Sequence, residues 1–174
     1  MQIRVATREQ KTVSVKTKAM LSRTSLRSGL QDFHEMPGYL VRRTHQISTA
    51  IFTEECARHD LTAIQYASLV AIGLHPLIDA TRISRLISLD RSTLGDVLER
   101  IETKGLVHRV ASPTDKRIKL LILSEKGEQL LADVEASVQR VQERLLQPLT
   151  AADRKTLLRL LTQLAEGHKD LPPA

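Results

Sequence analysis

The stretch 79–125 most tightly constrains how this 174-residue chain can fold, because its hydrophobic period changes part-way along. Apolar residues first recur at helical spacing, in a short segment that Asp79 or Thr81 can cap and in a second one that begins after Asp90. Gly105 is suited to end the second segment. We therefore expect two helices joined by a turn, with buried positions at Ile83, Leu86 and Ile87, and then at Leu94, Val97, Leu98 and Ile101.

The chain then changes to extended segments. Two runs dominated by β-branched residues, 107–111 and 118–123, flank residues 112–117, whose composition is that of a turn. A helix, a turn, a second helix and a hairpin with a charged tip, in this order, predict a winged helix-turn-helix. This module has one dominant physical use, which is to place its second helix in the major groove of DNA with the hairpin, or wing, beside it.

Longer helices are expected on both sides of this module. Residues 37–59 carry two apolar stripes, and a helix with two apolar faces is covered on two sides. In so short a chain, the second cover that we expect is another subunit. After 125 comes a long helix, an interruption at Pro148 and a leucine-rich last helix. The first stripe of 37–59 is Leu40, Thr44, Ile47 and Ile51, and the second is Val41, His45, Ser48, Phe52 and Cys56.

Charge is distributed unevenly along the chain, whose net charge is +6. Residues 82–119 carry nine Lys and Arg against five Asp and Glu, and residues 1–32 carry seven against two. The remaining residues are net negative. A basic patch that coincides with a winged helix is the electrostatic footprint of a nucleic-acid binder, although a chance asymmetry of a solvated surface is the alternative.

Other classes of protein find little support in the sequence. There is no nucleophile elbow, no glycine-rich phosphate loop and no paired carboxylates in a plausible cleft, so we expect no enzyme. The six histidines lack metal-ligand spacing, and we expect no metal and no cofactor. A single cysteine excludes an internal disulfide and favours a reducing cytoplasm. Without a long apolar run or a secretory signal, no membrane contact is expected.

The expected second helix presents polar residues on its outward side. Short hydroxyls at a helix N-terminus donate to phosphates or base edges, and the helix dipole assists them. Gly95 costs the helix about 1 kcal/mol relative to Ala, which indicates either close approach to a groove wall or a tight helix–helix contact. Carboxylates repel phosphate, so Asp96 and Glu99 would read cytosine or pair with Arg100. The DNA-contacting candidates in this helix are Arg91, Ser92, Thr93, Gly95, Asp96 and Arg100.

Two further groups of residues are candidates for DNA contact. At the wing tip, Arg117 would enter the minor groove, with Asp115 orienting its guanidinium and Lys116 beside it. Arg82 and Arg85, on the outer side of the preceding helix, would clamp phosphates. For each of these residues, an ordinary exposed surface charge is the alternative.

The chain resembles the MarR family of bacterial transcriptional regulators from about Pro37 to its end. The resemblance lies in four short segments, 90–94 (DRSTL), 101–109 (IETKGLVHR), 115–117 (DKR) and 123–127 (LSEKG). It implies a homodimer joined through the first and last helices, which binds a pseudo-palindromic operator. It also implies a repressor that is released by a small phenolic or aromatic acid. The segment 38–46 (GYLVRRTHQ) is similar to a subgroup that controls the catabolism of aromatic compounds.

The fold that we expect is therefore mainly α with a small β-wing. It is a winged helix-turn-helix, at about 62–124, flanked by N- and C-terminal dimerisation helices at about 36–59 and 125–169. Together these make a MarR-like domain over 34–174, preceded by a flexible basic arm over 1–33 with a helical turn near 18–26. The family's wing arginine maps to Arg117 and its leading Ser-Thr pair to Ser92 and Thr93, whereas Gly95 stands where members often carry a larger polar residue.

Candidate effector residues lie on the helix expected at 37–59 and on a second helix expected at 63–73. Arg43 would hold the carboxylate of an aromatic acid, the alternative being an ion pair with a neighbouring helix. Tyr39, His45 and Tyr66 are aromatic candidates for the same pocket, although His45 and Tyr66 would otherwise be ordinary packed residues. Two rival functions stay open: a repressor that senses oxidants through Cys56, and an architectural or interaction protein with a winged helix that senses nothing.

Overall fold

The computed structural model describes residues 33–171. The predictions made for the basic arm up to residue 32, including the helical turn near 18–26, lie outside the described residues. The chain divides into two compact units, residues 1–46 and residues 47–174. Helix α2 (Pro37–Glu55) begins in the first unit and ends in the second.

An aromatic cluster marks the start of α2 in the first unit. The ring of Tyr39 lies 4.9 Å from the ring of Phe33 and 4.9 Å from that of His34, measured between centroids. The guanidinium of Arg42 lies over the Tyr39 ring, 5.7 Å from its centroid. These contacts leave Tyr39 partly buried, and they account for one of the chain's few aromatic residues as a packing element.

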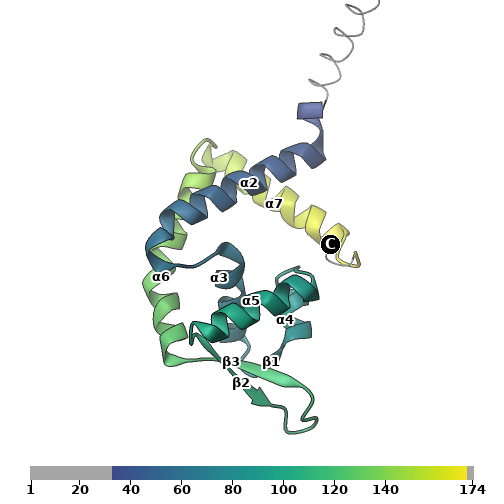
Figure 1. Ribbon diagram of the computed structural model, residues 1–174. Coiled ribbons are helices and arrows are strands. Elements are labelled where there is room, and N and C mark those ends of the chain that lie inside the picture. Colours follow the sequence, from purple (N-terminus) through teal and green to yellow (C-terminus); the bar gives the residue numbers. More distant parts are fainter. Residues whose placement is uncertain (1–32, 172–174) are drawn as a thin grey trace, which may run out of the picture. The chain divides into compact units, whose positions relative to one another are not determined.

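The second unit holds the predicted helix-turn-helix and wing (Figure 1). Each α-helix after α2 follows a capping residue, whose side-chain oxygen accepts a hydrogen bond from a free backbone N–H of the first turn. In order along the chain, the elements after α2 are η1 (Ala57–His59), α3 (Ala63–Leu74), β1 (Ile78–Asp79), α4 (Ala80–Leu86), α5 (Arg91–Thr103), β2 (Val107–Ala111), β3 (Lys119–Leu123), α6 (Glu125–Leu146) and α7 (Ala151–Gly167). The capping residues are Thr62, Asp79, Asp90, Ser124 and Thr150.

The sheet has three strands rather than the two that the sequence predicted. All pairs are antiparallel, and β3 lies between β1 and β2. Val107 pairs with Leu123 at the base of the hairpin, and Ile78 of β1 pairs with Leu121. Strand β1 is only two residues long, which is too short for the alternation by which a strand is recognised in sequence.

The core of the second unit is mainly aliphatic. The predicted inward face of α5, formed by Leu94, Val97, Leu98 and Ile101, is buried, and so is Ile83 of α4. One prediction of burial was wrong, because Leu86 is 53% exposed. Leu86 is the last residue of α4, a helix of only seven residues, and it lines an open hollow with Ile87 and residues of α3.

The first long helix is shorter than predicted. It ends at Glu55, a separate 3-10 turn covers Ala57–His59, and Asp60 adopts the left-handed conformation with φ of 47°. Along α2 only Phe52 is buried, so the two predicted apolar stripes are largely exposed in the single chain.

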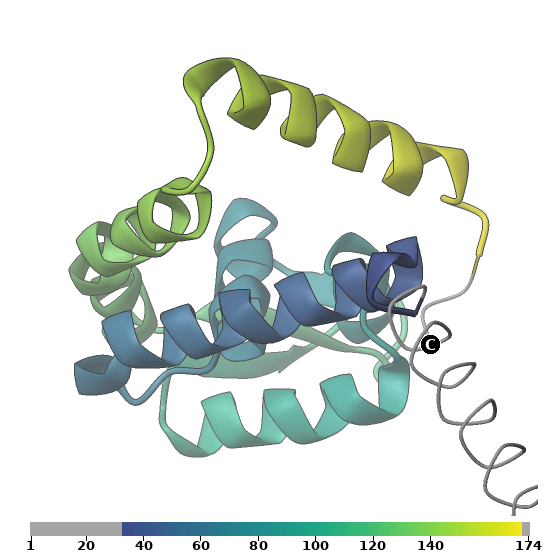
Figure 2. The same ribbon diagram turned by 90° about the horizontal axis from the view of Figure 1, so that it is seen from above.

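Helix α7 has no buried residue. It leaves the end of α6 and runs apart from the three-stranded sheet (Figure 2), with Leu158, Leu160, Leu161 and Leu164 all between 45% and 57% exposed. No helix within residues 33–171 is long and apolar enough to cross a membrane. In the same part of the chain, no group of three His, Cys, Asp or Glu residues is arranged to hold a metal ion.

Candidate nucleic-acid interface

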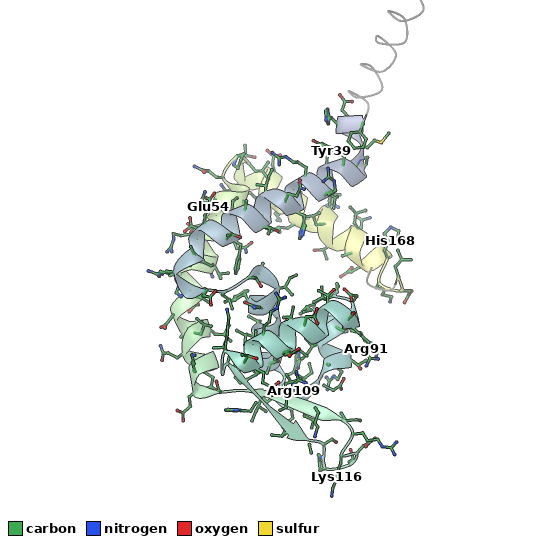
Figure 3. The ribbon with its side chains drawn as sticks, viewed as in Figure 1. Tyr39, Glu54, Arg91, Arg109, Lys116 and His168 are labelled. Carbon is green, nitrogen blue, oxygen red and sulfur yellow. The ribbon has the colours of Figure 1, made fainter. Side chains whose placement is uncertain are left out.

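The outward side of α5 is polar and uncovered. All six of its candidate DNA-contacting residues are exposed, and the opposite side of the helix is the buried face described above. Arg91 stands at the leading end of α5, and Lys116 stands at the tip of the β2–β3 hairpin, which extends beside this helix (Figure 3). The helix and the wing thus form a pair of neighbouring, solvent-facing elements.

The leading end of α5 is fixed by Asp90. Its Oδ1 accepts a hydrogen bond of 2.9 Å from the Thr93 backbone N–H. Hydrogen bonds from the Thr93 side chain, and then from its backbone, hold the pKa of Asp90 below its usual range. The carboxylate is therefore charged at neutral pH and orients the hydroxyl of Thr93, so one of the two predicted leading hydroxyls is already engaged within the protein.

Gly95 has open space around it. A Cβ built on this residue would meet no heavy atom within 4 Å outside its own helix. A tight helix–helix contact, one of the two explanations that the sequence left open, is therefore absent from the described part of the chain. Close approach of this side of α5 to a groove wall, the other explanation for Gly95, stays a prediction.

The acidic residues of α5 lie together with its arginine. Asp96, Glu99 and Arg100 border a polar hollow of about 780 Å³, whose other side is formed by Thr62 and Gln65 at the start of α3. Within residues 33–171, neither carboxylate forms an ion pair with Arg100, so the pairing suggested by the sequence is not present. A cytosine-reading role for either carboxylate stays a prediction.

The wing tip is held by its own side chains. Asp115 Oδ1 accepts from the Arg117 backbone N–H at 2.9 Å, and the Ser112 hydroxyl accepts from the Thr114 N–H at 3.3 Å. We expected Asp115 to orient the guanidinium of Arg117, but its carboxylate shapes the turn instead, and no ion pair joins the two in the described residues. The side chains of Lys116 and Arg117 are exposed at the tip.

An ion pair ties the wing to the helix. Arg109 Nε of β2 lies 2.8 Å from Glu102 Oε2 of α5. Sequence reasoning missed this pair, although the two residues flank the predicted helix stop at Gly105 and their opposite charges were a usable signal. Arg82 and Arg85 are exposed on α4, the helix that packs against α5.

These features agree with what the comparisons with known proteins find. A profile of the MarR family matches residues 59–118. The transcriptional regulator HosA of Escherichia coli is 30% identical over 132 residues, which cover 76% of this chain and 93% of HosA. The chain belongs to the MarR family. It is accordingly a transcriptional regulator and not an enzyme, as the sequence predicted.

Other relatives resemble this MarR-family chain over similar lengths. The transcriptional repressor NicR of Pseudomonas putida is 27% identical over 139 residues, which cover 80% of this chain and 88% of NicR. The structure of BpsR from Bordetella bronchiseptica has a TM-score of 0.73 at 26% identity and covers 76% of this chain and 95% of its own. The repressor CouR, solved on a 23-mer DNA duplex, has a TM-score of 0.72 at 29% identity, with 77% and 95% covered.

The four predicted effector residues do not form one described site. Tyr39, Arg43 and His45 belong to the first unit, where Arg43 and His45 are exposed, whereas Tyr66 belongs to the second. Tyr66 packs against the ring of Phe52 at 5.9 Å and lines an apolar hollow of about 420 Å³. Burial raises the pKa of its phenol, which therefore stays neutral. The other residues of this hollow are Ala67, Val70, Ala71, Leu74, His75, Leu86 and Ile87.

Cys56 is fully buried in the core of the second unit. Burial, and next the nearby charge of Glu55, raise the pKa of its thiol. A reactive cysteine requires a stabilised thiolate and access to solvent, and Cys56 has neither.

A network of ion pairs joins the end of α2 to α6. Glu55 accepts from Arg140 Nε at 2.8 Å and from Arg144 Nη1 at 2.6 Å, and Arg144 Nη2 reaches Glu54 at 2.8 Å. The hydrogen bonds from Arg140 and then Arg144 lower the pKa of Glu55. Beside it, Arg140 Nη2 donates to the buried hydroxyl of Ser137 at 2.8 Å. This network could not be predicted from the sequence, because Glu55 and Arg140 lie 85 residues apart.

Proposed function

We propose that this MarR-family regulator is a homodimeric repressor that binds a pseudo-palindromic operator and is released from it by a small aromatic acid. The observation that carries the DNA-binding part is the uncovered polar side of α5 beside an exposed basic wing tip. In this arrangement Ser92, Thr93 and Gly95 approach the major groove, while Lys116 and Arg117 lie along the backbone or in the minor groove.

The exposed leucines of α7 support the dimer. An apolar stripe at helical spacing that remains about half exposed is a surface for another apolar surface. A second copy supplies such a surface by symmetry, and it also places two copies of α5 on one duplex about one helical turn apart. CouR, solved on a DNA duplex, supports the same mode of binding.

The aromatic-acid effector is supported by a relative and by a cavity. BpsR is a protein whose DNA binding is regulated by 6-hydroxynicotinic acid, and this chain resembles it over most of its length. The apolar hollow beside Tyr66 has room for one aromatic ring, and it adjoins α4, which packs against α5. In this proposal Tyr66 contacts the aromatic ring of the acid in this hollow, while the predicted parts of Arg43, Tyr39 and His45, which belong to the first unit, stay predictions.

The DNA-binding part is tested by a mobility shift on an operator selected from random duplexes. Arg117→Ala and Thr93→Ala are each expected to weaken binding at moderate salt by about tenfold or more, in line with about 1–3 kcal/mol for a specific contact. Arg159→Ala, which removes the same charge from the exposed outer side of α7, serves as the control and should bind as wild type. Wild-type affinity in both interface variants would overturn the proposed contacts.

The effector part is tested by thermal shift and by release of the selected operator. 6-Hydroxynicotinic acid and 4-hydroxybenzoic acid serve as probes, with cyclohexanecarboxylic acid as a non-aromatic control. A ligand specific to the native state raises the unfolding temperature by mass action. Arg43→Ala should lose this response and keep its affinity for DNA. An unchanged response would remove Arg43 from the site.

A further inference from the structure

The link that follows α5, residues Lys104, Gly105 and Leu106, is held against the start of α6 through its backbone. A backbone carbonyl in such a link needs a hydrogen-bond donor, and a donor on another element fixes where the link lies. Here three successive carbonyls are taken up: that of Lys104 by Lys126 Nζ at 2.8 Å, that of Gly105 by the Ser124 hydroxyl at 2.7 Å, and that of Leu106 by the Ser124 N–H at 3.0 Å. We call these contacts the α5–α6 joint.

A glycine makes this joint unusually close. A Cβ built on Gly127 would lie 2.2 Å from the carbonyl oxygen of Leu106, a distance that real Cβ atoms do not reach. The two backbones therefore touch at this point. Because the contact is between backbone atoms, no change of side-chain rotamer relieves it, and α6 cannot shift toward Leu106 in the link between α5 and β2.

Lys104 connects the same joint to the end of α2. Its Nζ donates to the backbone oxygen of Asp60 and lies 2.9 Å from the Asp60 Oδ2. Asp60 holds the left-handed conformation directly after η1, where α2 gives way to α3. Lys104 is the last residue before Gly105, so one side chain joins the end of α5 to the turn between α2 and α3, while its carbonyl joins α5 to α6.

Lys104 affects the direction of α5 more than the free energy of folding. The Asp60 side chain is 93% exposed, and ion pairs in such surroundings contribute little to folding. Two bonds to one residue, one of them to a backbone atom, nevertheless restrict the direction of α5 more than a single charge pair does. With the charge pair alone, rotation of the Asp60 side chain would keep the carboxylate near the Lys104 ammonium group when α5 tilts. The Asp60 backbone oxygen cannot rotate in this way, so its hydrogen bond opposes the tilt.

We propose that Lys104 is a positioning residue that sets the tilt of α5 relative to α2 and α6, and thereby the spacing of the two half-sites that the regulator accepts. This inference rests on the proposed homodimer. Helix α5 has 13 residues, so its leading end lies roughly 18 Å from the joint. A tilt of about 10° moves that end by about 3 Å, which is close to the rise of one base pair, about 3.4 Å.

The test is binding to three duplexes that carry the selected half-sites at the preferred spacing and at one base pair more or less. The wild type should prefer one spacing by about tenfold or more. Lys104→Met keeps most of the apolar stem and removes the ammonium group, and it should reduce this preference to about threefold or less. Its affinity for a single half-site should stay within about twofold, because no DNA-facing residue changes. Lys104→Arg, which keeps a charged donor, should restore the preference.

A double-mutant cycle identifies the partner. Asp60→Asn tolerates the left-handed backbone and removes the charge, and combining it with Lys104→Met should add little to the effect of Lys104→Met alone. Lys169→Met, an exposed lysine beyond α7, controls for the loss of one positive charge. Unfolding temperature is measured for each variant, since a purely structural role lowers it without changing the spacing preference.

The outcomes separate the two proposals. If the wild type shows no preferred spacing or binds as a monomer, the proposed dimeric reader fails. If the wild type prefers one spacing and Lys104→Met keeps that preference, the role given to Lys104 is wrong. The role is also wrong if the double variant loses as much of the spacing preference as the two single variants together, because Lys104 would then not act through Asp60.

Discussion

The winged part of the molecule and helix α7 differ in how far their apolar side chains are buried within a single chain. In the winged part, α4, α5 and the three strands turn their aliphatic residues into a common core, and Ile83, Leu94, Ile101 and Leu121 are almost completely buried. In α7 the leucines are as well spaced for a helix, but none of them is buried. The difference indicates that one chain completes the DNA-facing unit and leaves a second surface open for association.

Truncation of the winged core should have the largest effect, and it should not depend on protein concentration. Ile101 is fully buried on α5, and Ile101→Ala removes buried methylenes and leaves a cavity. We expect a loss of about 2–5 kcal/mol in the free energy of unfolding, measured with urea. Equal losses at widely different protein concentrations would support a self-contained winged part. A loss that varies with concentration would mean that this part also depends on association.

A charge on the exposed face of α7 should act in the opposite way. Leu161→Asp places a carboxylate among the exposed leucines and should separate the dimer, with a loss of operator affinity of about 100-fold, or about 2.7 kcal/mol. Sedimentation and mobility shift measure the two effects. Gln163→Asp carries the same new charge on the other side of α7 and should remain dimeric. A dimeric Leu161→Asp protein would show that α7 is not the association surface.

Gly95→Ala should separate stability from DNA affinity within α5. With no atom within 4 Å of the added Cβ, the variant should gain about 0.5–1 kcal/mol in stability from the higher helix propensity of alanine. If this side of α5 meets the groove wall, operator affinity should fall by about tenfold. Thermal unfolding and a mobility shift decide the matter. A variant that is more stable and binds as tightly as wild type would exclude close approach at this position.

The smallest effect is expected at the ion pairs between α2 and α6. The folded state lowers the pKa of Glu55, so the stabilisation is present above the ordinary glutamate pKa of about 4.3. It is lost as the pH falls through the lower folded value. Glu55→Gln should therefore be less stable than wild type at neutral pH and should lose less stability on acidification. Unfolding temperatures at pH 7 and pH 3 test this, and equal pH profiles would contradict it.

Much of the winged part was predictable because its rules are local. A cap at Asp90, apolar residues at i, i+3, i+4 and i+7, and a glycine stop at Gly105 each act within a few residues, and α5 lies where they predicted. The hairpin followed from β-branched runs in the same way. Strand β1 could not be predicted, because two residues carry no period and Ile78 belongs to the sheet only through its partner Leu121.

The contacts that connect elements far apart in the sequence were beyond sequence reasoning. Lys104 and Asp60, or Glu55 and Arg140, are separated by 44 and 85 residues, and opposite charges alone select no pair among the many Lys, Arg, Asp and Glu residues of the chain. The wing tip showed a subtler failure. Asp115 and Arg117 do interact, as predicted. The Asp115 carboxylate, however, accepts from the Arg117 backbone N–H and not from its guanidinium.

The burial of Cys56 gives the protein an internal reporter. It is the chain's single thiol, it lies in the core where the end of α2 meets the rest of the second unit, and its raised pKa keeps it protonated and unreactive. Alkylating reagents therefore reach it only during transient opening of that core. The labelling rate of the unmodified protein thus measures how often α2 parts from its neighbours, and a change in that rate on binding DNA or an effector reveals whether either ligand acts on this end of the helix.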